Sequence, residues 1–197
     1  MSGFRVVLDT CVLVPIVKAD LLLTLAARQA FHPLWSCTIL RELSRAIVIA
    51  NPTMTEERAT VRIMDMNAAF EDALVEGWEP IEDCVPGIPD PNDRHAVAAA
   101  IRGNAAAIVT DNTKHFPDEA LREWGLHAVT SDDFLLDLLD LNPIRMLGCL
   151  IEMSDKRRNP PTTADDLIAA LERAALPKFA GKLRSIRDDV HVPGWRK

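Results

Sequence analysis

The chain has 197 residues, which is enough for one domain or for one domain with an appendage. Apolar residues make up 48% and charged residues 26% of it, an ordinary balance for a soluble globular protein. No apolar run approaches the roughly 20 residues of a membrane-spanning helix, and the first residues lack the pattern of a secretory signal. We therefore expect a protein without a membrane partner.

The net charge of −7 argues against a general binder of polyanions, but the charge is unevenly distributed. Residues 1–140 contain 11 Lys and Arg against 22 Asp and Glu, whereas residues 141–197 contain 11 against 7. An acidic body is therefore followed by a basic C-terminal segment.

The cysteine pattern indicates a reducing compartment. The four cysteines form no Cys-x-x-Cys pair and match no zinc-site spacing; they are Cys11, Cys37, Cys84 and Cys149. Reduced thiols are the simplest interpretation, so we expect a cytoplasmic protein.

Strands and helices alternate along the first 141 residues. The predicted strands and extended pieces cover residues 4–10, 32–36, 77–83, 105–110 and 126–130. The predicted helical segments cover residues 12–30, 38–50, 55–76, 91–102, 117–125 and 131–141. This alternation is typical of βαβ units, so we expect an α/β fold with a mainly parallel sheet.

Asn142-Pro143 marks a predicted boundary between a domain at residues 1–141 and a helical extension at residues 142–197. Three helical patterns follow this boundary, near residues 144–157, 163–175 and 177–188, without a strand pattern. The extension is short for a domain that folds on its own.

Two predicted strands end on a carboxylate. Asp9 follows an apolar run, where it could cap a turn or helix or face a ligand at the carboxyl edge of a parallel sheet. Asp111 follows the strand at residues 105–110, and the pair Asp111-Asn112 is also common in turns. Because neighbouring parallel strands end at the same edge of a sheet, we expect the two carboxylates to lie close together.

Two helical segments carry further acids. Asp90 and Asp93 flank the start of the helix at residues 91–102, where acids stabilise the positive helix end without any further role. Glu42 lies at the edge of an apolar helix face, where it could be an ordinary boundary residue paired with Arg45. Both helices can also present these acids to the strand ends.

Carboxylates from all four places would repel one another in a shared pocket, and a divalent cation would relieve this repulsion. Oxygen ligands suit Mg²⁺ or Mn²⁺ rather than zinc. Such ions bind phosphate groups and activate water in phosphodiester cleavage. The combination therefore favours a metal site over helix capping alone.

Four stretches of the sequence together resemble a PIN domain, and most closely the VapC-type toxins of bacterial toxin–antitoxin pairs. They are VVLDTCVL, TILREL, DPNDRHAVAAAI and AIVTDNTKHFP, in this order and spacing, within residues 4–140. The resemblance implies a three-layer sandwich and a ribonuclease that depends on Mg²⁺ or Mn²⁺. It also implies a homodimer that is inhibited by a small cognate antitoxin.

By this resemblance, Asp9, Glu42 and Asp93 occupy acidic positions of the family, and Asp90 occupies a commonly acidic neighbouring position. Thr10 could hydrogen-bond these acids or cap a helix equally well.

The last motif departs from the family pattern. The family often has Thr-x-Asn or Thr-x-Asp and then an Asp directly before Phe, whereas here Asn112 and His115 take these two polar positions. Either Asp111 supplies the fourth carboxylate, or Asn112 contributes through its amide oxygen or a water. Thr110 could support the site by a hydrogen bond.

We therefore expect an endoribonuclease that cleaves RNA phosphodiesters with a water activated by Mg²⁺ or Mn²⁺. The predicted metal ligands are Asp9, Glu42, Asp90, Asp93 and Asp111, all but Asp90 being predicted as catalytic too. The alternative is a catalytically silent PIN fold that binds RNA or protein.

Basic side chains of the extension could contact RNA phosphates, form a solvated helical face, or dock on the domain or on a second subunit. They are Arg145, Lys156, Arg157, Arg158, Lys178, Lys182, Arg184 and Arg187. The sequence leaves these three possibilities open.

Overall fold

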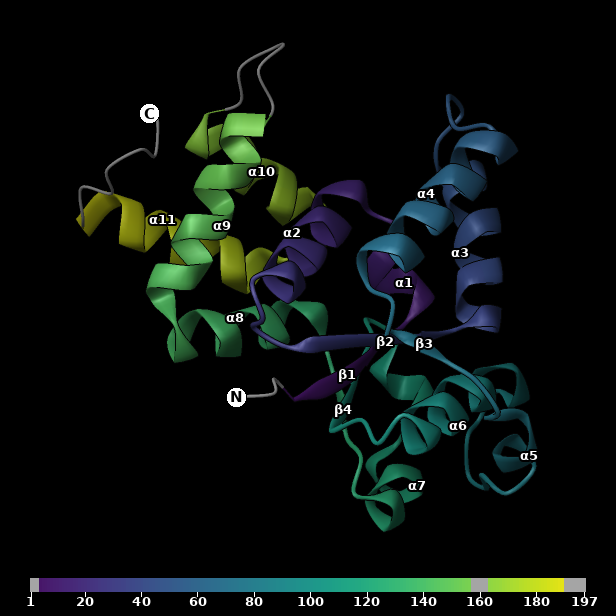
Figure 1. Cartoon of the computed structure of the whole chain (residues 1–197). Coiled ribbons are helices and arrows are strands. Elements are labelled where there is room, and N and C mark those ends of the chain that lie inside the picture. Colours follow the sequence, from purple (N-terminus) through teal and green to yellow (C-terminus); the bar gives the residue numbers. More distant parts are fainter. Residues whose placement is uncertain (1–3, 157–162, 190–197) are drawn as a thin grey trace. The chain divides into compact units, whose positions relative to one another are not determined.

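A computed structural model describes residues 4–156 and 163–189 of the chain (Figure 1). Within this part, the chain forms two compact units. The first contains residues 4–15 and 31–130, and the second contains residues 16–30 together with the described residues from 131 onward.

A five-stranded, entirely parallel sheet forms the centre of the first unit. Its strands are β1 (Arg5–Leu8), β2 (His32–Ser36), β3 (Leu74–Val75), β4 (Ala107–Val109) and β5 (Ala128–Val129), in the spatial order β3-β2-β1-β4-β5. Val7 of the central strand lies opposite Leu34 on one side and Ile108 on the other. The residues at positions 6–8 are fully buried, as expected for a strand covered on both faces. The predicted α/β class is confirmed.

Helices cover both faces of this sheet. Their bounds are α1 (Thr10–Leu13), α3 (Cys37–Ala50), α4 (Glu56–Ala69), α5 (Glu79–Glu82), α6 (Arg94–Arg102) and α7 (Asp118–Leu121). Figure 1 shows α1, α3 and α4 on one side of the sheet and α5, α6 and α7 on the other. Side-chain caps begin two of the helices, since Ser36 accepts from the Ile39 amide and Thr55 from the Arg58 amide. The unit is therefore a three-layer sandwich.

The region around β3 differs from the prediction. The predicted helix at residues 55–76 is too long, because α4 ends at Ala69 and residues 74–75 pair with the end of β2. Phe70, directly after α4, packs edge-on against the buried Trp35. The predicted extended piece at residues 77–83 is wrong, since α5 lies there with Pro80 in its first turn, where a proline is tolerated. Tertiary contacts thus determine the secondary structure of a segment whose local sequence pattern is ambiguous.

Gly103 allows α6 to approach the sheet closely. A Cβ atom at this position would lie 2.6 Å from Leu34 Cδ1 and 3.1 Å from Val75 Cγ2. Both distances are shorter than ordinary carbon–carbon contacts, so only glycine fits here without movement of its neighbours.

Five helices form the described part of the second unit. They are α2 (Ile16–Ala27), α8 (Ser131–Leu141), α9 (Pro143–Lys156), α10 (Ala164–Arg173) and α11 (Pro177–Asp189), which confirms the three predicted helical patterns after residue 142. Pro15 divides the predicted helical stretch at residues 12–30 into α1 and α2, which belong to different units. The helices bury an apolar core that includes Leu135, Leu150, Leu171 and Phe179.

A buried acid joins two helices of this unit. Asp132, at the start of α8, accepts hydrogen bonds from the backbone amides of Lys178 at 3.0 Å and Phe179 at 2.8 Å. These amides belong to the first turn of α11, where backbone N–H groups have no carbonyl partner within the helix. Asp132 therefore explains how α11 begins against α8.

The basic side chains of the extension are largely paired within the helical unit. Ion pairs join Lys156 to Glu152 at 2.7 Å, Lys178 to Asp133 at 2.7 Å, Arg184 to Glu172, and Arg187 to Asp165. Arg157 and Arg158 lie outside the described residues. These pairs favour the interpretation as a solvated helical face, and contact with RNA or docking stays a prediction.

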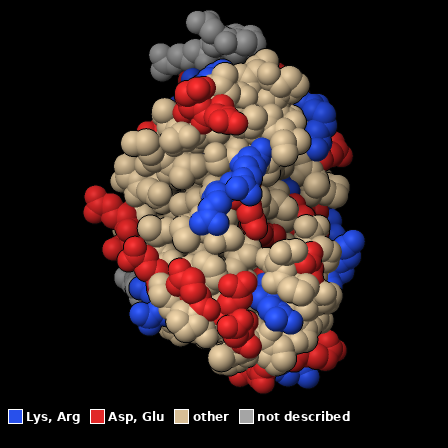
Figure 2. Space-filling model, turned by 90° about the vertical axis from the view of Figure 1, so that its right-hand side faces the viewer, with Lys and Arg blue, Asp and Glu red and all other residues tan. Residues whose placement is uncertain are grey.

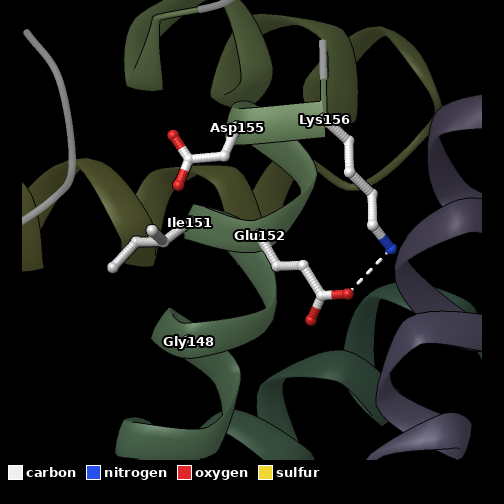
Figure 3. A pocket seen from close by; sticks show the side chains of 5 residues that line it. All are labelled: Gly148, Ile151, Glu152, Asp155 and Lys156. Atoms are coloured by element: carbon white, nitrogen blue, oxygen red, sulfur yellow. Dashed lines mark ion pairs between the residues drawn. The ribbon is translucent and has the colours of Figure 1, made fainter.

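An open surface hollow runs along α9 (Figure 3). It is lined by Gly148, Ile151, Glu152, Asp155 and Lys156. Besides Lys156, Glu152 also pairs with Arg28, directly after α2, with 2.6 Å between Oε2 and Nη2. The hollow thus lies over an ion-paired junction of two helices.

In the described part of the chain, every helix is too short or too polar to span a bilayer.

Candidate metal centre

Asp9 lies at the carboxyl end of β1, where it caps α1. Its Oδ1 accepts from the Thr10 amide at 2.7 Å, and its Oδ2 accepts from the Thr110 hydroxyl at 2.7 Å. Thr110 follows β4, the strand next to β1, and is fully buried. The structure therefore brings the two predicted strand ends together, and it fixes the Asp9 carboxylate between them.

Cys11 is a third hydrogen-bond donor to Asp9. Its Sγ lies 3.2 Å from Asp9 Oδ2 and also accepts from the Asp111 amide at 3.2 Å. Burial, followed by the nearby Asp9 charge, raises the pKa of the Cys11 thiol to about 12. The thiol is therefore protonated at neutral pH and supports Asp9 rather than acting as a nucleophile.

Glu42 is held on α3 by two side chains from other elements. Its Oε2 accepts from the Thr10 hydroxyl at 2.8 Å, and its Oε1 lies 3.1 Å from Nε2 of His95, on α6. Burial alone would raise the pKa of Glu42, but the hydrogen bonds from His95 and Thr10 outweigh it and lower this pKa. Among the described residues, Glu42 is thus paired with His95 and Thr10 rather than with Arg45.

His95 is a buried histidine with one satisfied nitrogen. It is only 5% exposed, and its ring lies 6.0 Å from that of Trp78, between centroids. Nδ1 of His95 is buried and has no hydrogen-bond partner among the described residues. An ionised Glu42 can only accept, so Nε2 of His95 is the donor in this hydrogen bond.

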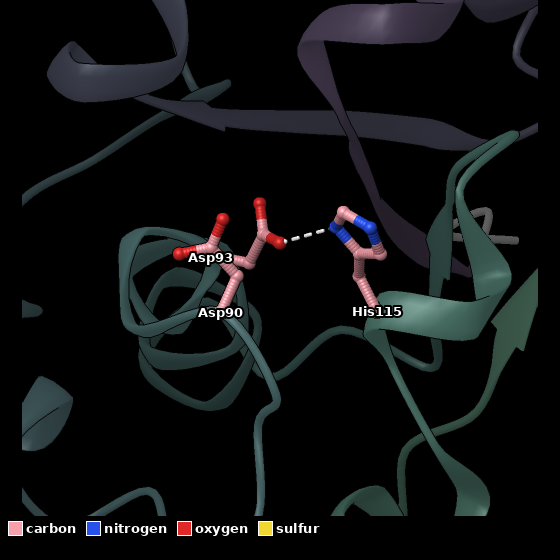
Figure 4. A group of neighbouring side chains, drawn as sticks. All are labelled: Asp90, Asp93 and His115. Carbon is pink, nitrogen blue, oxygen red and sulfur yellow. Dashed lines mark hydrogen bonds and ion pairs between the residues drawn. The ribbon is translucent and has the colours of Figure 1, made fainter.

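The second half of the site is formed by Asp90, Asp93 and His115 (Figure 4). Asp90 caps the 3₁₀ turn at Pro91–Asp93 by accepting from the Asn92 amide at 2.9 Å. Asp93 points towards His115, with 2.7 Å between Oδ2 and Nδ1. One potential ligand atom from each of the three residues lies within 4.8 Å of the others. We call these three residues the Asp90–Asp93–His115 cluster.

Charge repulsion acts on this cluster. Burial raises the pKa of Asp93, the hydrogen bond from His115 lowers it, and the charges of Asp9 and Asp90 raise it again, with a net rise. Asp9 is therefore close enough to Asp93 to act on it electrostatically. A cation bound between these carboxylates would remove the repulsion.

The comparisons with known proteins identify the family of the first unit. The PIN domain family matches residues 5–114, which are more than half of the chain. The chain belongs to the PIN domain family. A second family, described as the VapC50 C-terminal domain, matches residues 131–185 and so begins with α8 of the helical unit.

A curated relative agrees with both matches. A protein of Mycobacterium tuberculosis named "Putative ribonuclease VapC50" is 45% identical over 94 residues. These residues are 48% of this chain and 55% of the relative, so the match spans about half the length of each protein. No solved structure matches the chain. The predicted resemblance to a VapC-type PIN domain with a C-terminal helical extension is confirmed.

The PIN unit places the predicted site residues in two linked groups. Asp9, Thr10, Glu42 and Thr110 belong to one hydrogen-bonded network. Asp90 and Asp93 belong to the cluster, which among the described residues does not include Asp111.

The structure does not decide whether Asp111 or Asn112 supplies the fourth ligand, because the hydrogen bonds given for both involve their backbone groups. The Asp111 amide donates to Cys11, and the Asn112 amide donates to the Thr110 hydroxyl at 3.1 Å. Asn112 is exposed, and its backbone oxygen accepts from the His115 amide. The choice between Asp111 and Asn112 therefore stays a prediction.

Sequence reasoning missed two histidines. His115 is a partner of Asp93, although its position directly before Phe116, where the family often has an acid, was a usable signal. His95 binds Glu42 across 53 positions of sequence, and no local pattern reports such a contact. Both histidines connect elements that are far apart in the chain.

The donor set fits a divalent cation. Two carboxylates and one imidazole are common ligands of Mn²⁺ and related ions, and carboxylates alone suit Mg²⁺. Ligands about 2.1 Å from one octahedral ion lie about 3 to 4 Å from one another, and the potential ligand atoms of the cluster all lie within 4.8 Å of one another. Asp90, Asp93 and His115, with Asp9 nearby, could therefore hold such an ion.

Proposed function

We propose that the PIN unit is an endoribonuclease that depends on Mg²⁺ or Mn²⁺ and serves as the toxin of a VapBC-type toxin–antitoxin pair. The main support is the cluster of half-buried acids at the carboxyl edge of the parallel sheet, where burial, followed by the charges of Asp9 and Asp90, raises the pKa of Asp93. Such a cluster is unfavourable without a cation. The similarity to a protein named as a ribonuclease supports the choice of RNA as the substrate.

The residues have different proposed roles. Asp9, Asp90 and Asp93 hold the ion, and Thr110 keeps the Asp9 carboxylate in place. Glu42, oriented by Thr10 and His95, binds a water molecule or accepts a proton. A divalent ion bound here lowers the pKa of a water molecule and offsets negative charge on the phosphate during cleavage. Asp111 or Asn112 completes the site.

The side of the PIN unit on which α3, α4, α5 and α6 lie is mixed in charge. Figure 2 shows the side of the molecule on which α3, α4, α5 and α6 lie in Figure 1. Acidic side chains form clusters on this side, and Lys and Arg side chains lie among them. RNA phosphates that approach this side would meet both signs of charge, so the bound ion would supply much of the local attraction.

The partners follow from the VapC relationship. We propose a small cognate antitoxin as the inhibitor, a homodimer as the assembly and the cytoplasm as the compartment. We also propose that residues 1–141 carry the nuclease and that residues 142–197 form a separate helical extension.

The test is cleavage of total cellular RNA by the purified chain, with Mn²⁺ or with EDTA. We expect discrete fragments that require both the metal and Asp93, so that Asp93→Asn gives intact RNA. Asp72→Asn, at an exposed turn outside the cluster, is the matched control and should cut normally. Cleavage by Asp93→Asn at the wild-type rate would refute the assignment.

The second candidate is a catalytically silent PIN fold that binds RNA or protein. The departure at His115 from the family pattern favours it, because a carboxylate is missing there. Intact RNA with folded, metal-loaded and antitoxin-free protein would select this candidate.

A further inference from the structure

His115 occupies the position at which the resemblance leads one to expect a carboxylate. It does not leave the site, because its Nδ1 lies 2.7 Å from Asp93 Oδ2. The side chain of His115 is 32% exposed and that of Asp93 is 28% exposed, so both are accessible to a small ion. The substitution therefore changes the chemistry of the cluster and keeps its geometry.

The backbone holds His115 in this position. A 3₁₀ turn at Thr113–His115 follows β4, and the His115 amide donates to the Asn112 carbonyl at 2.9 Å. The next residue, Phe116, is 2% exposed, and its amide closes the turn on the Thr113 carbonyl. A buried anchor on one side and a strand on the other fix the backbone position of His115.

We propose that His115 is a direct ligand of the bound ion and that it makes this site select Mn²⁺ or a similar first-row transition ion over Mg²⁺. This inference rests on the proposed metal-dependent function and names the ion at the same site. The ligand set then has two carboxylates and one nitrogen from the cluster. The imidazole binds through a neutral nitrogen, with the ring proton on the other one.

Two physical effects give this preference. Imidazole suits first-row transition ions, whereas Mg²⁺ is a hard ion that takes oxygen ligands almost exclusively. An imidazole in place of a carboxylate also removes one negative charge from the ligand set, which weakens the purely electrostatic attraction on which Mg²⁺ depends. Both effects act in the same direction.

The opposing interpretation is that Nδ1–H of His115 donates to Asp93 and only orients that carboxylate. Supporting histidine–carboxylate pairs of this kind are common around metal sites. In that case no nitrogen contacts the ion, and the change from carboxylate to imidazole affects metal choice only weakly. A spectroscopic measurement on the ion separates the two interpretations.

The experiment uses the full chain loaded with Mn²⁺ and no RNA. Pulsed electron paramagnetic resonance of the Mn²⁺ ion should show coupling to a directly bound ¹⁴N, which changes to ¹⁵N when the histidines are labelled. His115→Asp should abolish this coupling and still bind the ion. Absence of coupling in the wild-type chain, or its persistence in His115→Asp, would overturn the proposal.

Calorimetric titration of Mn²⁺ and Mg²⁺ gives the second readout. We expect His115→Asp to lower the ratio of Mn²⁺ to Mg²⁺ affinity by about tenfold or more, because it restores an oxygen ligand. An unchanged ratio in the folded variant would contradict the inference. His115→Gln, which keeps a polar side chain without an imidazole, should also lose the nitrogen coupling.

These measurements do not depend on catalysis. Nitrogen coupling in a chain that leaves RNA intact would support the His115 ligand and refute the ribonuclease. RNA cleavage without nitrogen coupling would support the ribonuclease and refute the ligand.

Discussion

Asp93→Asn should stabilise the chain when no metal is present. When metal is added, the variant should be less stable than the wild type. Carboxyl oxygens of Asp90 and Asp93 lie within 4.8 Å, and two unit charges at that distance repel by about 0.9 kcal/mol in water and about 3.5 kcal/mol at an effective dielectric constant of 20. Because Asp93 is half-buried, its repulsion from Asp90 should lie between these two energies. The variant loses part of the hydrogen bond to His115, which is worth about 1 kcal/mol. The net increase in its free energy of unfolding is therefore about 1 kcal/mol. For a chain of this size, the melting temperature should rise by about 2–4 °C without metal.

With metal, the order should invert. At a free Mn²⁺ concentration 100 times the Kd, the wild-type chain gains about 2.7 kcal/mol, which corresponds to a rise of about 5–11 °C. The variant lacks one carboxylate ligand and should gain little of this. It is therefore the more stable chain in EDTA and the less stable one in excess Mn²⁺.

Thermal denaturation in EDTA and in Mn²⁺ measures both differences, with Asp72→Asn as a charge-matched control that should show neither. The pH dependence has a defined sign, because the pKa of Asp93 is raised in the folded chain. The advantage of the variant should be absent below the ordinary carboxyl pKa and complete above the raised one. A variant that melts below the wild type in EDTA at neutral pH, or that keeps the wild-type Mn²⁺ shift, would refute the reasoning.

Three further predictions concern the surroundings of the site and the packing of the two units. Thr10→Val removes the donor to Glu42, and a hydrogen bond to a charged group contributes about 1.5–3 kcal/mol, so RNA cleavage should slow about tenfold or more. Thr10→Ser should restore most of that rate, and failure of the rescue would contradict the role of the hydroxyl. Gly103→Ala should lower the free energy of unfolding in urea by about 1–3 kcal/mol, because its Cβ meets Leu34 and Val75; no change would show that these neighbours yield freely. Phe179→Ala should destabilise the helical unit by about 3–5 kcal/mol, so that proteases cut it before the PIN unit; simultaneous cleavage of both would show that they unfold together.

The parts of the fold that sequence alone predicts are those with strong local patterns. The strand at residues 5–8 is an uninterrupted buried run, and the helix at 94–102 begins after Asp90, Pro91 and Asp93 in the arrangement that starts a helix. The rule that parallel strands end at one edge then places Asp9 beside Thr110. Each of these inferences uses only near neighbours or a general property of sheets.

The parts that sequence does not predict depend on contacts across the chain. The segment at residues 70–83 has a weak pattern, and its two-residue strand exists only because β2 offers an edge to pair with. Similarly, the partner of Glu42 was expected one helical turn away, at Arg45. The observed partner is His95, on helix α6, which covers the other face of the sheet. Periodicity cannot distinguish these partners, since both would satisfy a carboxylate at the edge of an apolar face.

The carboxylates of the site differ in how well the protein itself satisfies them. Both oxygens of Asp9 and both oxygens of Glu42 take part in hydrogen bonds with the chain, and the pKa of Glu42 is lowered because its bonds to His95 and Thr10 outweigh burial. Asp93, in contrast, has a raised pKa because burial and the charges of Asp9 and Asp90 outweigh the bond from His115. A carboxylate that the protein already stabilises gains less from a cation than one that is repelled by its neighbours. The free energy of metal binding should therefore come mainly from Asp93, while Asp9 and Glu42 provide fixed oxygens at which an ion and a substrate phosphate can be oriented.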